Sequence, residues 1–148
     1  MSKRRDQRMM GRALALAALN QGLTGENPSV GCVILDKHGH IVGEGVTGHG
    51  GRPHAEEIAL DEAGARAKGG TAFVTLEPCR ERSSGAASCS NKLVSAGIAR
   101  VVVAIEDPHP TARDGLRILR EAGVRVEAGR GKARAARLYV WFFAGVRK

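Results

Sequence analysis

The order of the apolar segments is the feature that most constrains the fold of this chain. Two strand-like segments, residues 30–35 and 41–46, flank a turn at residues 36–39, and this pattern predicts a β-hairpin. Three further strand-like segments then alternate with segments of helical periodicity, which is typical of βαβ units around a largely buried sheet. We therefore predict the α/β class, with a three-layer α/β/α sandwich built on a mixed five-stranded sheet.

The remaining elements follow from the same patterns. The first helix should end before Gly22, because glycine commonly follows a helix C-terminus. Ala136, Val140 and Phe143 should share one face of the last helix, which either packs on the core or forms a contact between subunits. Helices are expected at residues 5–21, 54–67, 90–96, 115–122 and 132–144, and further strands at residues 71–76, 101–105 and 124–127.

The composition fits one ordinary globular domain. With 148 residues, 43% of them apolar, the chain is long enough for a single core and too apolar for a disordered protein. We therefore expect residues 1–148 to form one domain. The net charge of +8 favours an anionic partner, either a nucleic acid or a phosphorylated small substrate. The scarcity of aromatic residues makes nucleic acid the less favoured partner, because few side chains are left for base stacking.

The cysteine count and the N-terminal segment bear on the compartment. Three cysteines make a poor disulfide framework and fit a reducing cytosol. Basic residues 3–5 precede the apolar run 13–19, as in a signal peptide, but the run is too short to span a bilayer. Met10, Leu14 and Ala17 share one side of a helix. We expect a packed first helix in a cytoplasmic protein without a membrane association.

Two short segments carry the residues from which we predict the chemistry. His54 opens a predicted helix, Cys79 directly follows a predicted strand, and Cys89 opens the next helix. One imidazole and two thiolates are the three protein ligands of a catalytic zinc site, whose fourth position is left for water. We therefore predict His54, Cys79 and Cys89 as ligands and Zn²⁺ as the cofactor. Glu56, two residues after His54, would move protons between the attacking water and a leaving amine.

The prediction of a zinc site rests on the joint pattern. Taken singly, the histidine could cap a helix, the glutamate could be a solvated first-turn residue, and the cysteines could be core residues. His-x-Glu, then Pro-Cys, then a second Cys is the order found in zinc-dependent base deaminases, in which a zinc-bound hydroxide is the nucleophile. Here nine residues separate Cys79 from Cys89, instead of two. The third cysteine, Cys32, lies in a predicted strand and is expected in the core. As a fourth ligand it would make the zinc structural.

At these residues the chain resembles the cytidine deaminase superfamily, and most of all the deaminase domain of the bifunctional riboflavin-biosynthesis deaminase/reductase. The similarity extends over roughly residues 9–127. The stretches that carry it are GENPSVGCVI at 25–34, HGGRPHAE at 49–56, TLEPC at 75–79 and DPHP at 107–110.

The resemblance implies hydrolytic removal of an exocyclic amine from a diaminopyrimidinone ribosylamino phosphate. It assigns zinc to His54, Cys79 and Cys89, and proton transfer to Glu56. It also implies that Asn27 and His49 hold the pyrimidine, and that the protein forms a homodimer or a larger assembly. Arg80 is the main candidate for contact with the substrate phosphate, with Arg82 and Arg52 as further candidates.

Several departures from the family pattern leave alternatives open. Residues 80–88 read RERSSGAAS, where the family has a His-His-Gly-Arg-Thr-Pro-Pro run beside the substrate, and His109 replaces an asparagine. No reductase domain is present in the sequence, so that activity would come from another chain. One alternative is a deaminase of another aminated heterocycle, such as a nucleobase, a nucleoside or a base in RNA. A non-catalytic zinc module is a further alternative, against which Glu56 argues.

Overall fold

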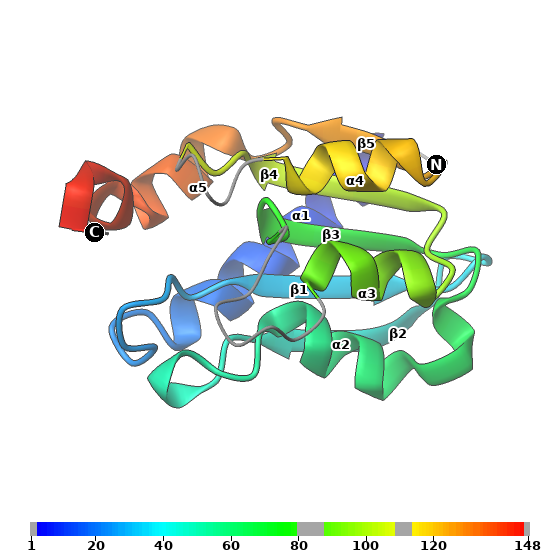
Figure 1. Cartoon of the computed structure of the whole chain (residues 1–148), viewed down its shortest axis with the longest axis horizontal. Helices are drawn as coiled ribbons and strands as arrows, with labels where there is room; N and C mark the ends of the chain where they lie inside the picture. The colour runs from blue at the N-terminus through cyan, green and yellow to red at the C-terminus, as the bar shows by residue number, and fades with distance from the viewer. Residues whose placement is uncertain (1–2, 80–87, 109–113, 147–148) are drawn as a thin grey trace.

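A five-stranded sheet forms the centre of the computed structural model, which describes residues 3–79, 88–108 and 114–146 (Figure 1). The strand order is β2-β1-β3-β4-β5. β1 pairs antiparallel with both β2 and β3, whereas β4 and β5 run parallel to β3. The predicted mixed five-stranded sheet is therefore confirmed. The strands are β1 (Gly31–Leu35), β2 (Ile41–Val46), β3 (Thr71–Leu76), β4 (Arg100–Ile105) and β5 (Arg125–Ala128).

Helices cover both faces of the sheet and complete the three predicted layers. Successive side chains of a strand point to opposite faces. Cys32 and Ile34 accordingly join the core under α2, α3 and α4, whereas Val33 and Leu35 join the core under α1 and α5. Figure 1 shows α2, α3 and α4 in front of the sheet and α1 behind it. The helices are α1 (Lys3–Leu19), α2 (Ala55–Ala63), α3 (Cys89–Ser95), α4 (Gly115–Glu121) and α5 (Lys132–Leu138).

Glycines in β2 let α2 lie directly on the sheet. A Cβ atom at Gly43 would lie 2.2 Å from the carbonyl oxygen of Ala59, and one at Gly45 would lie 2.2 Å from that of Ala55. Real Cβ atoms do not approach backbone so closely, so both positions require glycine. The N-terminal end of α2 is thereby fixed against β2.

Two predicted helices end four or more residues earlier than expected. The helix predicted over residues 54–67 ends at Ala63, because Gly64 takes a left-handed φ of 56°, and a 3-10 turn (Gly64–Ala67) follows. The helix predicted over residues 132–144 ends at Leu138, and a π-helical segment, Phe142–Val146, comes after it.

The last predicted helix packs on the core through residues other than the three expected on one face. The expected Val140 is 53% exposed, and the buried residues are Ala135 and Tyr139. The physical reason is the Tyr139 hydroxyl, which lies 2.7 Å from that of Thr75 and donates a hydrogen bond to the Ser29 carbonyl at 2.8 Å. This polar contact in the core fixes the rotation of α5.

The first helix packs as predicted. Met10, Leu14 and Ala17 are buried against the sheet. None of the helices in the described ranges is both long enough and apolar enough to span a membrane.

Candidate metal centre and active site

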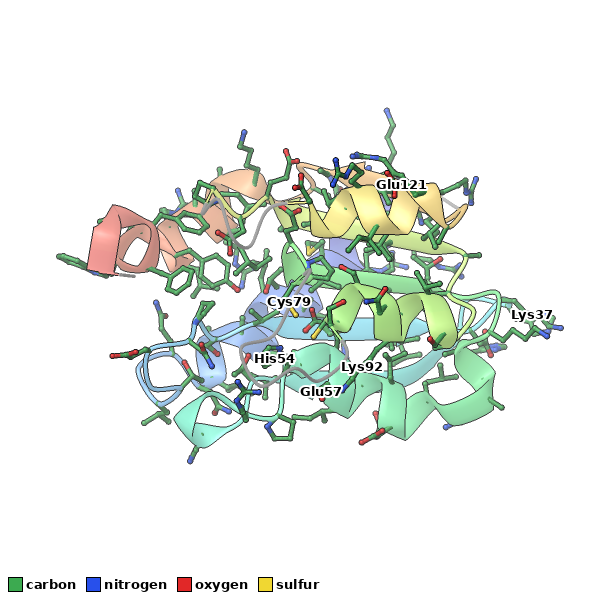
Figure 2. All side chains as sticks on the ribbon, viewed as in Figure 1. Lys37, His54, Glu57, Cys79, Lys92 and Glu121 are labelled. Atoms are coloured by element: carbon green, nitrogen blue, oxygen red, sulfur yellow. The ribbon has the colours of Figure 1, made fainter. Side chains whose placement is uncertain are left out.

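The three residues predicted as zinc ligands come from three elements that meet at one edge of the sheet. His54 directly precedes α2 with an extended backbone, Cys79 lies three residues after the end of β3, and Cys89 is the first residue of α3. Figure 2 shows His54 and Cys79 facing each other in front of the sheet. The structure thus brings together residues that are 35 positions apart in the sequence.

The ligand atoms are close enough to share one metal ion. The Nδ1 atom of His54 lies 3.2 Å from the Sγ atom of Cys89, and the backbone N–H of Cys89 donates to the Sγ atom of Cys79 at 3.2 Å. All three ligand atoms lie within 4.8 Å of one another. Ligands of a tetrahedral zinc are roughly 3.3–3.8 Å apart, given bonds of about 2.0–2.3 Å. The donor set and its spacing therefore fit zinc.

Backbone hydrogen bonds fix the position of Cys79 relative to the start of α3, which carries Cys89. The N–H of Ser90 donates to the carbonyl oxygen of Cys79 at 3.2 Å. Ser88 caps α3, its hydroxyl accepting the N–H of Asn91 at 3.1 Å. Cys79 and the first turn of α3 therefore form one local unit.

The two thiols share their protons unequally. A hydrogen bond from the Cys89 side chain lowers the pKa of Cys79 to about 4, against the opposing effect of burial, and His54 lowers that pKa further. The same bond, together with burial, raises the pKa of Cys89. Cys79 is thus the thiol that more readily forms a thiolate, and metal binding would release the proton of Cys89.

Glu56 lies beside this group as a buried carboxyl. It is the second residue of α2 and only 4% exposed. Burial raises its pKa to about 7, and the charge of Cys79 raises it while that of His54 lowers it. A carboxyl that titrates near neutral pH can both accept and return a proton under physiological conditions.

Comparison with known proteins decides the family. Residues 3–105 match the family described as "Cytidine and deoxycytidylate deaminase zinc-binding region". The chain belongs to this deaminase family. The family is a zinc-binding one, and His54, Cys79 and Cys89 are the group within the described ranges that could hold a metal.

Within the deaminase family, relatives 45–50% identical to this chain are proteins of riboflavin biosynthesis, which confirms the resemblance drawn from the motifs. "Riboflavin biosynthesis protein RibD" of Escherichia coli is 46% identical over 96% of this chain and 38% of its own length. The "Diaminohydroxyphosphoribosylamino-pyrimidine deaminase" of Buchnera aphidicola is 45% identical over 81% of each protein. The structure of Acinetobacter baumannii RibD has a TM-score of 0.85 at 43% identity, over 95% of this chain and 39% of that one. The chain spans about a third of the length of these RibD relatives.

A second buried carboxyl near the candidate metal centre, Glu77, lies two residues before Cys79 and was not among the predicted site residues. Glu77 is 8% exposed and accepts the backbone N–H of Asp107 at 3.0 Å and that of Leu116 at 3.3 Å. It therefore ties the ends of β3 and β4 to the first turn of α4. A cavity of about 340 Å³ lies alongside. The available signal was a glutamate directly after a buried strand, since such a carboxyl needs hydrogen-bond donors.

Two of the residues predicted to bind substrate, Asn27 and His49, lie in segments that contact each other just before His54. The side-chain amide of Asn27 donates to the carbonyl oxygen of Gly51 at 3.1 Å, within the short turn that begins at His49. Asn27 and His49 are both exposed, as is Arg52. Arg80 and Arg82 lie outside the described residues.

The excess positive charge lies on the layer opposite the candidate site. Residues 3–19 and 130–137, which include α1 and most of α5, contain nine basic residues and one acidic residue. The rest of the chain contains fourteen of each. The net charge of +8 is therefore not gathered around the candidate metal centre.

The predicted core position of Cys32 is confirmed, because its side chain is fully buried in β1.

Proposed function

We propose that this chain is a zinc-dependent hydrolase that removes the exocyclic amine of a diaminopyrimidinone ribosylamino phosphate in riboflavin biosynthesis. The observation that carries the proposal is the grouping of His54, Cys79 and Cys89 beside the buried carboxyl of Glu56. Further support comes from the Buchnera relative named for this deamination, which is 45% identical over most of both chains.

In this proposal three residues of the site bind the metal and a fourth transfers the proton. His54, Cys79 and Cys89 would hold zinc, which when bound lowers the pKa of a water ligand towards neutrality and so supplies the nucleophile. Glu56 accepts a proton from the attacking water and delivers it to the exocyclic amine as the bond between that nitrogen and the ring carbon breaks. One water is consumed, one ammonia is released, and the ring carbon becomes a carbonyl.

The substrate contacts are assigned to loops around this centre. Asn27 and His49 hold the pyrimidine, and Arg80 binds the phosphate, with Arg52 as a further candidate. In this proposal residues 1–148 act as one deaminase domain in a homodimer or larger assembly.

A second candidate is deamination of another aminated heterocycle. It is favoured by residues 80–88, whose sequence RERSSGAAS departs from the family run beside the substrate. A nucleobase, a nucleoside and an RNA base are the classes to be compared.

The test is ammonia release by the zinc-loaded protein. The diaminopyrimidinone ribosylamino phosphate is compared with cytidine, guanine and a short RNA, and Glu56→Ala and Glu56→Gln serve as controls with the ligands intact. Release from the diaminopyrimidinone by the wild type, at least about 100-fold above either variant, is the expected result. Release from another compound instead would select the second candidate. A zinc-loaded, folded protein that releases ammonia from none of them would refute both.

A further inference from the structure

Glu57 is a charged residue beside the candidate metal centre that the proposed reaction does not use. It is the third residue of α2, and its side chain is only 17% exposed. Its Oε1 atom accepts the backbone N–H of His54 at 3.0 Å. Its Oε2 atom forms an ion pair with the Nζ atom of Lys92 in α3. One carboxylate therefore contacts both the ligand-bearing start of α2 and the neighbouring helix.

The two residues of this ion pair have the same sequence spacing from the two candidate ligands. Glu57 follows His54 by three residues, and Lys92 follows Cys89 by three residues. Residues three apart lie on the same side of a helix, about one turn from each other. The ion pair thus joins α2 and α3 one turn beyond the point where His54 and Cys89 meet. Figure 2 shows the labelled side chains of Glu57 and Lys92 between the two helices.

Partial burial makes the attraction between Glu57 and Lys92 stronger than that of a fully exposed ion pair. Lys92 is 32% exposed and Glu57 17%, so the solvent screens their attraction only in part. Cys89 is the first residue of α3, so any shift of the helix along its axis moves the Sγ atom relative to His54. A cross-link one turn away is well placed to limit such a shift.

We propose that the Glu57–Lys92 ion pair is a positioning contact that fixes the separation of His54 and Cys89 and thereby sets the affinity for zinc. Neither residue touches the reacting atoms in this account. The inference rests on the proposed function only in taking zinc as the bound metal. Outer contacts that orient metal ligands commonly change metal affinity by about 10- to 100-fold when removed.

The experiment is a double-mutant cycle on zinc affinity. Glu57→Gln, which keeps an oxygen for the His54 N–H, Lys92→Met and the double variant are each titrated with zinc against a chromogenic chelator. The visible spectrum of the cobalt-loaded protein reports the ligand geometry. Each single variant should bind zinc about 10-fold more weakly, and the double variant should be no worse than either. Lys92→Arg, which keeps the cation, should bind as the wild type does.

A matched ion pair elsewhere separates positioning from general stability. Arg12 and Glu44 join α1 to β2 through an exposed ion pair, and Arg12→Met and Glu44→Gln should leave the zinc affinity unchanged. Thermal unfolding of each metal-free variant shows how much stability was lost. Unchanged zinc affinity in Glu57→Gln and Lys92→Met, additive effects, or a loss that the Arg12 and Glu44 variants share would each overturn the proposal. No substrate is used, so failure of the proposed deamination would not alter this result.

Discussion

The Nδ1 atom of His54 lies 3.2 Å from the Sγ atom of Cys89, although 35 residues separate the two in the sequence. The contact exists because α2 and α3 lie on one face of the sheet and begin at the same edge. Cys79, which follows β3, completes the group there. The chemistry that we propose therefore depends on how closely α2 and α3 pack against the sheet.

The seating of α2 can be tested at Gly45. A Cβ atom there would lie 2.2 Å from the carbonyl oxygen of Ala55, the residue after His54. Gly45→Ala should push the start of α2 away from β2, weaken zinc binding, and lower the free energy of unfolding by about 1–3 kcal/mol. Thermal unfolding and a zinc titration measure the two effects. Gly11→Ala in α1 is the control, expected to be neutral or slightly stabilising, because its Cβ would meet only Arg134, at 3.9 Å. A Gly45→Ala protein with wild-type zinc affinity would contradict this role.

The burial of Glu56 predicts a pH dependence of stability in the metal-free protein. The pKa of Glu56 is raised from 4.5 to about 7, so the folded state holds this proton more tightly than the unfolded state does. The stabilisation is complete below pH 4.5 and is lost as the pH rises through 7. Relative to Glu56→Gln, the wild type should lose up to roughly 3 kcal/mol between pH 4.5 and pH 8, at about 1.4 kcal/mol per pH unit. Denaturant unfolding of both proteins across this range measures the difference, and a constant difference would show that the charged carboxylate is not buried.

The Tyr139 hydroxyl links α5 to the loop that carries Asn27. It donates to the carbonyl oxygen of Ser29 at 2.8 Å and lies 2.7 Å from the hydroxyl of Thr75. Tyr139→Phe leaves the Ser29 carbonyl short of a donor in the core, and should lower the free energy of unfolding by about 1–3 kcal/mol. Trp141→Phe is the control, because Trp141 is 76% exposed and should change stability by less than about 0.5 kcal/mol. Equal effects in denaturant unfolding would argue against the buried bond.

Glu77 is predicted to hold the ends of β3 and β4 against the first turn of α4. Glu77→Ala removes the acceptor of the Asp107 and Leu116 N–H groups and should cost about 2–4 kcal/mol, since each buried donor left unpaired costs about 1–2 kcal/mol. Glu77→Gln, which retains one oxygen, should lose about half as much. Hydrogen exchange at Asp107 and Leu116 should quicken in the alanine variant. Unchanged exchange there would contradict the assignment.

The sequence was sufficient to predict the layout of the sheet and the grouping of the candidate metal ligands. The strands Ile41–Val46 and Thr71–Leu76 were predicted with their observed bounds, because glycine, proline or charged residues flank them. The meeting of His54, Cys79 and Cys89 followed from the order of strands and helices, since the C-terminal end of a strand lies near the start of the following helix.

What the sequence did not reveal depends on contacts between distant residues. The end of α5 is set by the Tyr139 hydroxyl, whose partners Ser29 and Thr75 are more than 60 positions away. The roles of Glu57 and Glu77 likewise arise from distant partners, Lys92 and Asp107, which the sequence alone does not identify. Arg80, predicted to bind the phosphate, lies outside the described residues and stays a prediction.

X-ray absorption at the zinc edge of the loaded protein tests the central claim most directly. We predict one zinc per chain with two sulfur ligands at about 2.3 Å and two nitrogen or oxygen ligands at about 2.0–2.1 Å, from Cys79, Cys89, His54 and a water. Cys79→Ser and Cys89→Ser should each remove one sulfur from this shell. A shell of three sulfurs would place Cys32 on a closed structural zinc, and a shell without sulfur would place the metal elsewhere. Either result would contradict the proposed catalytic centre.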